Sequence, residues 1–277
     1  MQKILVTTDL LEDSKAGMQF AIQLSMQNDA QLTFFHSFYI LKPTSWNDKD
    51  VNTFENDEEN KLQKQLNKFV DDVYKEMNIV NENKRCVIDS SVVKDSDIVE
   101  YAQSHDFDFI CISTKGAGTF QRFFGTNTSN IITHSLIPVI AVPQNYHNAP
   151  ISSILYASDL VNLEKELPKV FNFAKMFDAN INILHINYAT DSNTKKIVAN
   201  KLISEYNSSK IYLNIVDAGF TDSLITNIEA MIDEIRPSIL VMFTEQHRNF
   251  FEKMFLASKA AGYSFNAKVP LLVFSKE

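Results

Sequence analysis

The chain repeats itself once. The segment Ile4–Leu10 (ILVTTDL) returns as Ile154–Leu160 (ILYASDL), and its aspartate moves by 150 positions (159 minus 9). Further matching segments follow in the same order: 32–36 with 181–185, 109–114 with 239–244, and 137–142 with 269–274. This period far exceeds the roughly 20 to 50 residues of a solenoid repeat. The sequence therefore predicts a duplicated domain, and any function has to be sought in both copies.

A short polar stretch separates the two copies. A length of 277 residues fits two domains of about 100 to 200 residues each. Gln144–Asn148 lies between two prolines and has the composition of a linker. We expect a first domain at residues 1–146 and a second at residues 150–277. The second is shorter, because the offset between copies falls from 149 (185 minus 36) to 130 (244 minus 114).

Short apolar runs alternate with stretches of helical spacing in both copies. This pattern is typical of buried parallel strands that alternate with helices. Right-handed crossovers then predict the α/β class, with two doubly wound, Rossmann-like parallel sheets in tandem. In the first copy, a long amphipathic helix is expected from Leu62 onward. The acidic stretch 47–60 before it is expected to be a solvated loop or a frayed helix start.

Composition excludes several classes of protein. A net charge of −8 and the lack of a basic run argue against a nucleic-acid partner. The two cysteines have no spacing typical of a disulfide framework or a zinc site. No apolar leader precedes the first strand, and no apolar run reaches the roughly 18 residues that a bilayer span needs. We therefore expect no membrane association and a cytoplasmic location.

Polar and small residues gather where the predicted strands of the first copy end. Ligands of open parallel sheets bind beyond the carboxyl ends of the strands. A glycine turn followed by a second glycine and hydroxyl residues at a helix start offers backbone N–H groups to a phosphate. The candidate binding residues are Thr7, Thr8, Asp9, Ser37, Ile112, Ser113, Lys115, Gly116, Gly118, Gly125, Thr126, Asn127 and Thr128.

On these residues the chain resembles a tandem universal stress protein, a family with an adenine nucleotide α-hydrolase-like fold. Its nucleotide-binding members carry the loop Gly-x2-Gly-x9-Gly-Ser/Thr, and an aspartate after the first strand that meets the adenine end of ATP. Asp9 matches that aspartate, Gly116 the second glycine and Gly125–Thr126 the closing pair. Ser113 stands in place of the first glycine, and eight residues instead of nine separate Gly116 from Gly125. Gly118 can absorb the missing residue, since glycine tolerates unusual backbone angles.

The second copy departs further from the family pattern. Asp159 is kept, but Glu245 replaces Lys115, and Ala257–Ser258 aligns with Gly125–Thr126. A carboxylate repels a triphosphate. The resemblance therefore implies ATP as the cofactor of the first domain only. It also implies that the last strand of each copy forms an internal pseudo-dimer, and a homodimer of the whole chain stays open.

Plainer interpretations stay open beside these. Asp9 and Asp159 could cap the following helices, and Gly116 and Gly118 could form only a tight turn. His36 and His185 are expected to be packing residues, because no second ligand is spaced to complete a metal site. No motif pairs a nucleophile with a base, so an enzyme is not favoured. Three functions remain: an ATP-binding stress-response protein, a nucleotide-free interaction scaffold, and a slow ATP hydrolase.

Overall fold

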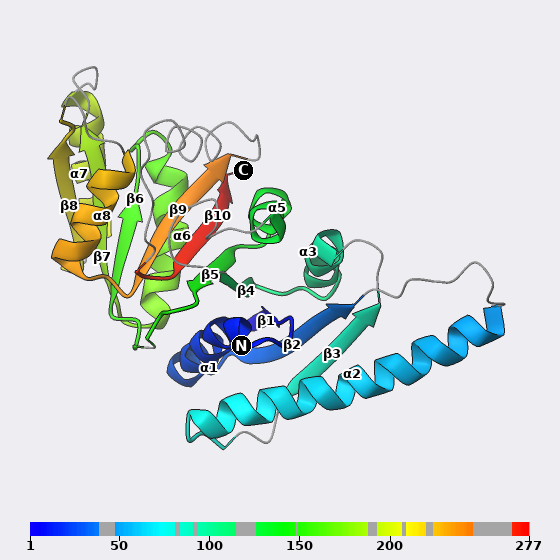
Figure 1. Cartoon of the computed structure of the whole chain (residues 1–277). Helices are drawn as coiled ribbons and strands as arrows, with labels where there is room; N and C mark the ends of the chain where they lie inside the picture. Colours follow the sequence, from blue (N-terminus) through cyan, green and yellow to red (C-terminus); the bar gives the residue numbers. More distant parts are fainter. Residues whose placement is uncertain are drawn as a thin grey trace. The chain divides into compact units, whose positions relative to one another are not determined.

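The computed structural model describes residues 1–38, 48–80, 84–90, 94–114, 126–147, 149–187, 193–206, 209–219, 224–245 and 268–276 (Figure 1). The chain divides into two compact units. Strands β1 to β5 belong to the first unit, and strands β6 to β10 belong to the second.

The first unit is a parallel sheet with strand order β3-β2-β1-β4-β5. The strand order reverses direction at β1, as in other doubly wound folds. Its elements in chain order are β1 (Lys3–Thr7), η1 (Glu12–Ser14), α1 (Lys15–Asn28), β2 (Gln31–Phe38), α2 (Asp48–Glu76), β3 (Arg85–Ser90), α3 (Lys94–Ser104), β4 (Phe109–Thr114), α5 (Thr126–His134) and β5 (Val139–Pro143).

The helices of the first unit cover both faces of this sheet. Side chains alternate between the two faces along a strand. Phe34 contacts Tyr74 of α2 at 6.0 Å between ring centroids, whereas the next residue, Phe35, contacts Tyr101 of α3 at 4.7 Å. Helices α1 and α2 therefore lie on one face, and α3 lies on the other, where it contacts α5.

Helix α2 begins earlier than the apolar spacing indicates. It starts at Asp48 and runs for 29 residues alongside β3 (Figure 1). Among its described side chains, from Phe54 onward, the buried ones all lie in the second half: Leu66, Val70, Val73 and Tyr74. Of the two expectations for the acidic stretch, the helix start is the one that the structure shows from Asp48 onward, and the loop is wrong there. The apolar spacing from Leu62 marks only the packed part of the helix.

The second unit has the matching strand order, β8-β7-β6-β9-β10, and its strands are also parallel. Helix α7 has 13 residues against 29 in α2, which accounts for most of the shortening between copies. The elements are β6 (Ser153–Ala157), α6 (Leu163–Met176), β7 (Asn180–Asn187), α7 (Asn193–Glu205), β8 (Ile211–Asp217), α8 (Leu224–Ile235), β9 (Ile239–Glu245) and β10 (Leu271–Lys276).

The predicted α/β class with parallel sheets is confirmed. The central strands are buried on both faces, as parallel strands covered by helices must be. Leu5, Ile110 and Ile140 are each 0% exposed in the first unit, and Leu155 and Leu272 are 0% exposed in the second. Within the described parts of the chain, no helix has both the length and the apolarity to cross a bilayer.

Candidate functional site

The carboxyl ends of β1, β2 and β4 lie at the same edge of the first sheet. Thr7 pairs with Phe35 on β2, and Val6 pairs with Cys111 on β4. The structure therefore brings together the predicted site residues Thr7, Thr8, Asp9, Ser37, Ile112 and Ser113. Lys115, Gly116, Gly118 and Gly125 lie outside the described residues. Thr126 and Asn127 begin α5, where only their backbone is described, and Thr128 is buried in its first turn.

The turn after β1 is held by two local hydrogen bonds. Thr8 Oγ1 accepts the Leu10 N–H at 3.0 Å, and Asp9 Oδ1 accepts the Leu11 N–H at 3.1 Å. They hold Leu10 at a positive φ of 62°, which non-glycine residues rarely adopt. Asp9 thus stabilises the turn and does not cap α1, whose N-cap is Ser14.

The second unit builds the same turn after β6. Ser158 Oγ accepts the Leu160 N–H at 3.1 Å, and Asp159 Oδ1 accepts the Val161 N–H at 2.9 Å. Leu160 has a φ of 61°. Because both copies build the same turn, the repeated aspartate is explained without a ligand. Any difference in ligand binding between the two copies must therefore come from other residues.

His36 and His185 pack against these turns. His36 Nδ1 lies 2.8 Å from the Thr8 carbonyl oxygen, and His185 Nδ1 lies 3.1 Å from that of Ser158. A carbonyl oxygen only accepts, so Nδ1 carries the proton in both rings. Among the residues that the structure describes, no group of three or more His, Cys, Asp or Glu could hold a metal ion. The packing interpretation of the two histidines agrees with these contacts.

Ser113 turns its hydroxyl toward α1. Its Oγ accepts the Gly17 N–H at 2.7 Å and donates to the Ser14 carbonyl oxygen at 2.8 Å. Gly17 is the third residue of α1, a position whose N–H is normally satisfied by the side chain of the N-cap. The Ser14 hydroxyl instead contacts Thr8 Oγ1 and the Leu11 carbonyl oxygen, each at 2.7 Å. A strand residue far away in sequence therefore caps this helix.

Gly17 allows this close approach between α1 and β4. A Cβ atom at Gly17 would lie 2.7 Å from Ser113 Oγ, 2.9 Å from Ser113 N and 3.2 Å from the Ile112 carbonyl carbon. Two of these atoms belong to the backbone, which cannot rotate away as a flexible side chain would. The glycine is required here by packing.

We expect Gly17→Ala to destabilise the first unit. Alanine gains up to about 1 kcal/mol in helix propensity, but overpacking of this kind typically costs about 1–3 kcal/mol. The free energy of unfolding, measured in urea, should therefore fall. A matched change on the same helix, Ser25→Ala, removes only a hydroxyl that donates to the Ile22 carbonyl and should have a smaller effect. Higher stability of Gly17→Ala would contradict the close approach.

Ser37 lies on the opposite face of the sheet from Ser113. It shares the face of Phe35, which contacts α3, because the two are separated by two positions on β2. Ser37 is 9% exposed, and its hydroxyl has no hydrogen-bond partner among the described residues. A buried hydroxyl without a partner is rare and costs about 1–3 kcal/mol. Among the described residues at this edge of the first sheet, it is the buried polar atom that calls for an additional polar group.

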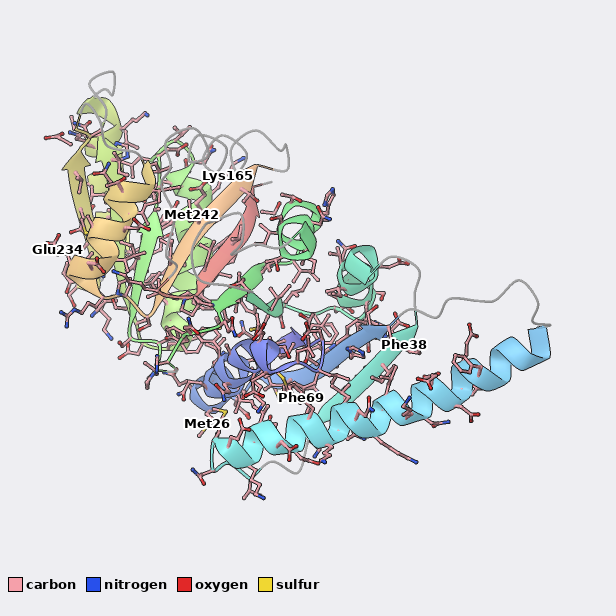
Figure 2. The ribbon with its side chains drawn as sticks, in the orientation of Figure 1. Met26, Phe38, Phe69, Lys165, Glu234 and Met242 are labelled. Atoms are coloured by element: carbon pink, nitrogen blue, oxygen red, sulfur yellow. The ribbon has the colours of Figure 1, made fainter. Side chains whose placement is uncertain are left out.

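The second unit has apolar side chains at three positions that match candidate binding residues of the first. With the offsets of the repeat, Thr7, Ser37 and Ile112 correspond to Ala157 (157 minus 7 is 150), Ile186 (186 minus 37 is 149) and Met242 (242 minus 112 is 130). Ile186 is 6% exposed and Met242, labelled on β9 in Figure 2, is 5% exposed. Phe38, labelled in the same figure, marks the carboxyl end of β2 in the first unit, next to Ser37.

The second unit contains a buried polar pair that was not predicted from the sequence. Tyr156 of β6 donates a short hydrogen bond from its hydroxyl to Glu166 Oε2 of α6. Tyr156 is 0% exposed and Glu166 is 4% exposed. Burial, followed by the negative charge of Glu166, raises the pKa of Tyr156. The repeat itself indicated the pair, because Tyr156 replaces Val6 at the strand offset of 150, and Glu166 replaces Gly17 at the helix offset of 149 (166 minus 17).

A model of the universal stress protein family matches residues 1–143. Among solved structures, a universal stress protein from Archaeoglobus fulgidus DSM 4304 has a TM-score of 0.69 at 15% sequence identity, over 99% of this chain and 96% of that chain. A protein from Pseudomonas aeruginosa UCBPP-PA14 with the same family name has a TM-score of 0.58 at 12% identity, over 99% and 93% of the two chains. Both likenesses concern the fold. Comparison with the curated proteins gave no match. Because the family model covers more than half of the 277 residues, the chain belongs to the universal stress protein family.

Proposed function

We propose that the first unit binds an adenine nucleotide, with ATP as its ligand. The second unit is then a nucleotide-free structural partner, and the chain is a tandem member of the family. The observation that carries this proposal is the buried Ser37 hydroxyl, which has no partner among the described residues and lies at the carboxyl end of β2. Ligands of open parallel sheets bind at this edge.

A bound ligand would complete the hydrogen bonding of Ser37. The hydroxyl can donate one hydrogen bond and accept two. A nucleoside carries several donors and acceptors on its base and sugar. Thr7 lies on the same face of the neighbouring strand and is also buried. The site therefore offers hydroxyls for the nucleoside part of the ligand.

The phosphate part belongs to the predicted loop after β4. The loop sequence Lys115–Gly118 and the pair Gly125–Thr126 supply a lysine, glycines and the start of α5. Backbone N–H groups at a helix start favour anions. Ser113, which stands where the family has glycine, turns its side chain toward α1. That orientation keeps the serine away from the face of Ser37, so this departure from the family pattern does not argue against the proposal.

Residues of the second unit support the proposal that only the first unit binds nucleotide. Ile186 fills the place of Ser37, and Ala157 fills that of Thr7. Neither side chain can form a hydrogen bond with a ligand. Together with Glu245 in place of Lys115, these residues favour a first unit that binds nucleotide and a second that does not.

Gly125→Val tests the phosphate part of the proposal. A β-branched side chain would crowd the approach of phosphate to the backbone, so ATP should bind at least about tenfold more weakly, which is about 1.4 kcal/mol. Titration calorimetry on the full chain measures this, with the matched change Ala257→Val in the second copy as a control that should leave affinity unchanged.

One result would decide against nucleotide binding, and a second would decide only against the phosphate loop. If the purified protein releases no nucleotide on denaturation and shows no calorimetric binding, the interaction scaffold is favoured. Unchanged ATP affinity of Gly125→Val would remove the phosphate loop from the site. A slow hydrolase would require ATP turnover that disappears in the same variant. Pairing of the last strands and a homodimer remain predictions.

A further inference from the structure

We propose that Asp89 is a specificity-determining residue, which together with Ser37 selects ligands that present a hydrogen-bond donor to the carboxyl ends of β2 and β3. This inference rests on the proposed nucleotide site. An adenine nucleotide carries such donors in the hydroxyls of its ribose and in the amino group of its base. Both are uncharged groups with a hydrogen to donate, and analogues that lack one of them distinguish the two.

Asp89 lies beside Ser37 on the neighbouring strand. The two residues are partners in the parallel register of β2 and β3, which lie side by side (Figure 1). Residues paired in register point to the same face of a sheet, and for Ser37 this is the face that Phe35 shares with α3. Neighbouring strands lie about 4.8 Å apart. A single ligand group at this edge can therefore reach both side chains.

The Ser37 hydroxyl is the observation that points to a ligand here. It is buried and has no hydrogen-bond partner among the described residues, although a carboxylate lies on the next strand. Ser37 and Asp89 are thus not hydrogen-bonded to each other. A carboxylate has about four lone-pair sites, so Asp89 can accept from a ligand in addition to contacts within the protein.

The chemistry of Asp89 determines which part of a nucleotide can face it. A carboxylate accepts hydrogen bonds and donates none, and its charge repels phosphate. In the strand order β3-β2-β1-β4, three strand spacings separate Asp89 from β4, which is about 14 Å. The group next to Asp89 is therefore a donor of the nucleoside. A phosphate at the end of β3 would be unfavourable.

The second unit has an apolar pair at the matching place. Ile186, the counterpart of Ser37, is paired in register with Val216 on β8. Neither side chain can form a hydrogen bond with a ligand. The polar pair thus belongs to the unit that is proposed to bind nucleotide. Val216 also shows that valine fits at this position of such a sheet, so Asp89→Val is expected to fold.

The test compares ATP with three analogues by titration calorimetry on the full chain. The analogues are 2′-deoxy-ATP, 3′-deoxy-ATP and inosine triphosphate, which lack one ribose hydroxyl, the other hydroxyl and the adenine amino group. At least one should bind about tenfold more weakly than ATP, because a site built to accept from a donor rejects the analogue without it. Asp89→Val should weaken ATP binding by about tenfold and leave the binding of that analogue within about twofold, so that the preference disappears.

A second variant and a control accompany this measurement. Asp89→Asn keeps the shape of the side chain but removes the charge and one acceptor, so it should reduce the preference in the same direction. It replaces Asp89→Val if the valine protein folds poorly. Asp57→Val makes the same chemical change at an exposed position of α2. It should leave every affinity unchanged.

The outcomes separate this inference from the proposed function. If the unmodified protein binds none of the four ligands, the nucleotide site fails and the role of Asp89 fails with it. If it binds ATP and all three analogues equally, only the role of Asp89 is overturned. An equal loss of all four affinities in both Asp89 variants would also overturn that role, since a purely structural residue leaves the preference intact.

Discussion

Replacing Ser37 by isoleucine, the residue at the matching position of the second unit, should weaken ATP binding by at least about tenfold. The larger apolar side chain removes the hydroxyl from the site and occupies the space next to it. The sheet of the second unit already accommodates isoleucine at Ile186, which is 6% exposed. The variant is therefore expected to fold, and calorimetry with ATP on the full chain measures the effect.

Ser37→Ala separates a ligand contact from a structural role. Removing a buried hydroxyl that lacks a partner should leave the free energy of unfolding unchanged or raise it by up to about 1 kcal/mol. ATP affinity should nevertheless fall by severalfold, because the ligand loses a hydrogen bond. Stability and binding then move in opposite directions. A variant that binds ATP as before, or that unfolds more readily in urea, would show that Ser37 has another partner.

The reverse exchange in the second unit is the matched control. Ile186→Ser places a hydroxyl in an apolar environment, which should lower stability by about 1–3 kcal/mol. It should not create ATP binding, because the phosphate loop of that copy has no glycine at the aligned positions. A chain with Gly125→Val and Ile186→Ser that binds ATP more tightly than Gly125→Val alone would contradict the proposed asymmetry.

Tyr156→Phe should lower the stability of the second unit by about 2 kcal/mol, the typical contribution of a hydrogen bond to a charged group. The Tyr156 hydroxyl donates to Glu166 Oε2 between β6 and α6, and both side chains are buried. Phenylalanine fills the same volume but leaves the carboxylate without this donor. Urea unfolding followed by fluorescence and circular dichroism measures the loss. Tyr212→Phe, at a tyrosine that is 49% exposed, is the control and should have little effect.

The same hydrogen bond predicts the direction of an alkaline pH effect. Burial and the charge of Glu166 raise the pKa of Tyr156 in the folded protein above its ordinary value of about 10. A raised folded pKa means that the folded state holds the proton more tightly than the unfolded state. The contribution of Tyr156 is therefore intact below about pH 10 and falls as the pH rises further. Tyr156→Phe should lose less stability than the unmodified protein between neutral and strongly alkaline pH.

A double variant distinguishes the hydrogen bond from packing. Replacing the pair by apolar residues of similar size, Tyr156→Phe with Glu166→Leu, removes donor and acceptor together. Such exchanges are often close to neutral, whereas removal of one partner is destabilising. The double variant should therefore be more stable than Tyr156→Phe alone. If the two are equally stable, the hydrogen bond contributes nothing and the prediction is wrong.

The order of hydrophobic runs was sufficient to predict the fold class. Buried parallel strands such as β1, β4 and β5 are continuous in apolar residues, so their ranges are visible in the sequence. Strands β3 and β8 are mixed in composition and only partly buried, so their ranges are less visible in the sequence. The first half of α2 has no apolar spacing, and its described side chains, 54–61, are mostly exposed, so only the packed half was predictable.

At the candidate site, the sequence by itself determined which residues follow the strands: Thr8, Asp9, Ser37 and Ser113 could be named from strand ends and from the repeat. Only the tertiary structure decided what each side chain does. Ser113 caps α1 because residues 96 positions apart (113 minus 17) meet when β4 packs beneath that helix. Ser37 is separated from Ser113 because strand alternation and pairing place them on opposite faces of one sheet. Such contacts depend on distances between segments remote in sequence, and local patterns carry no information about those distances.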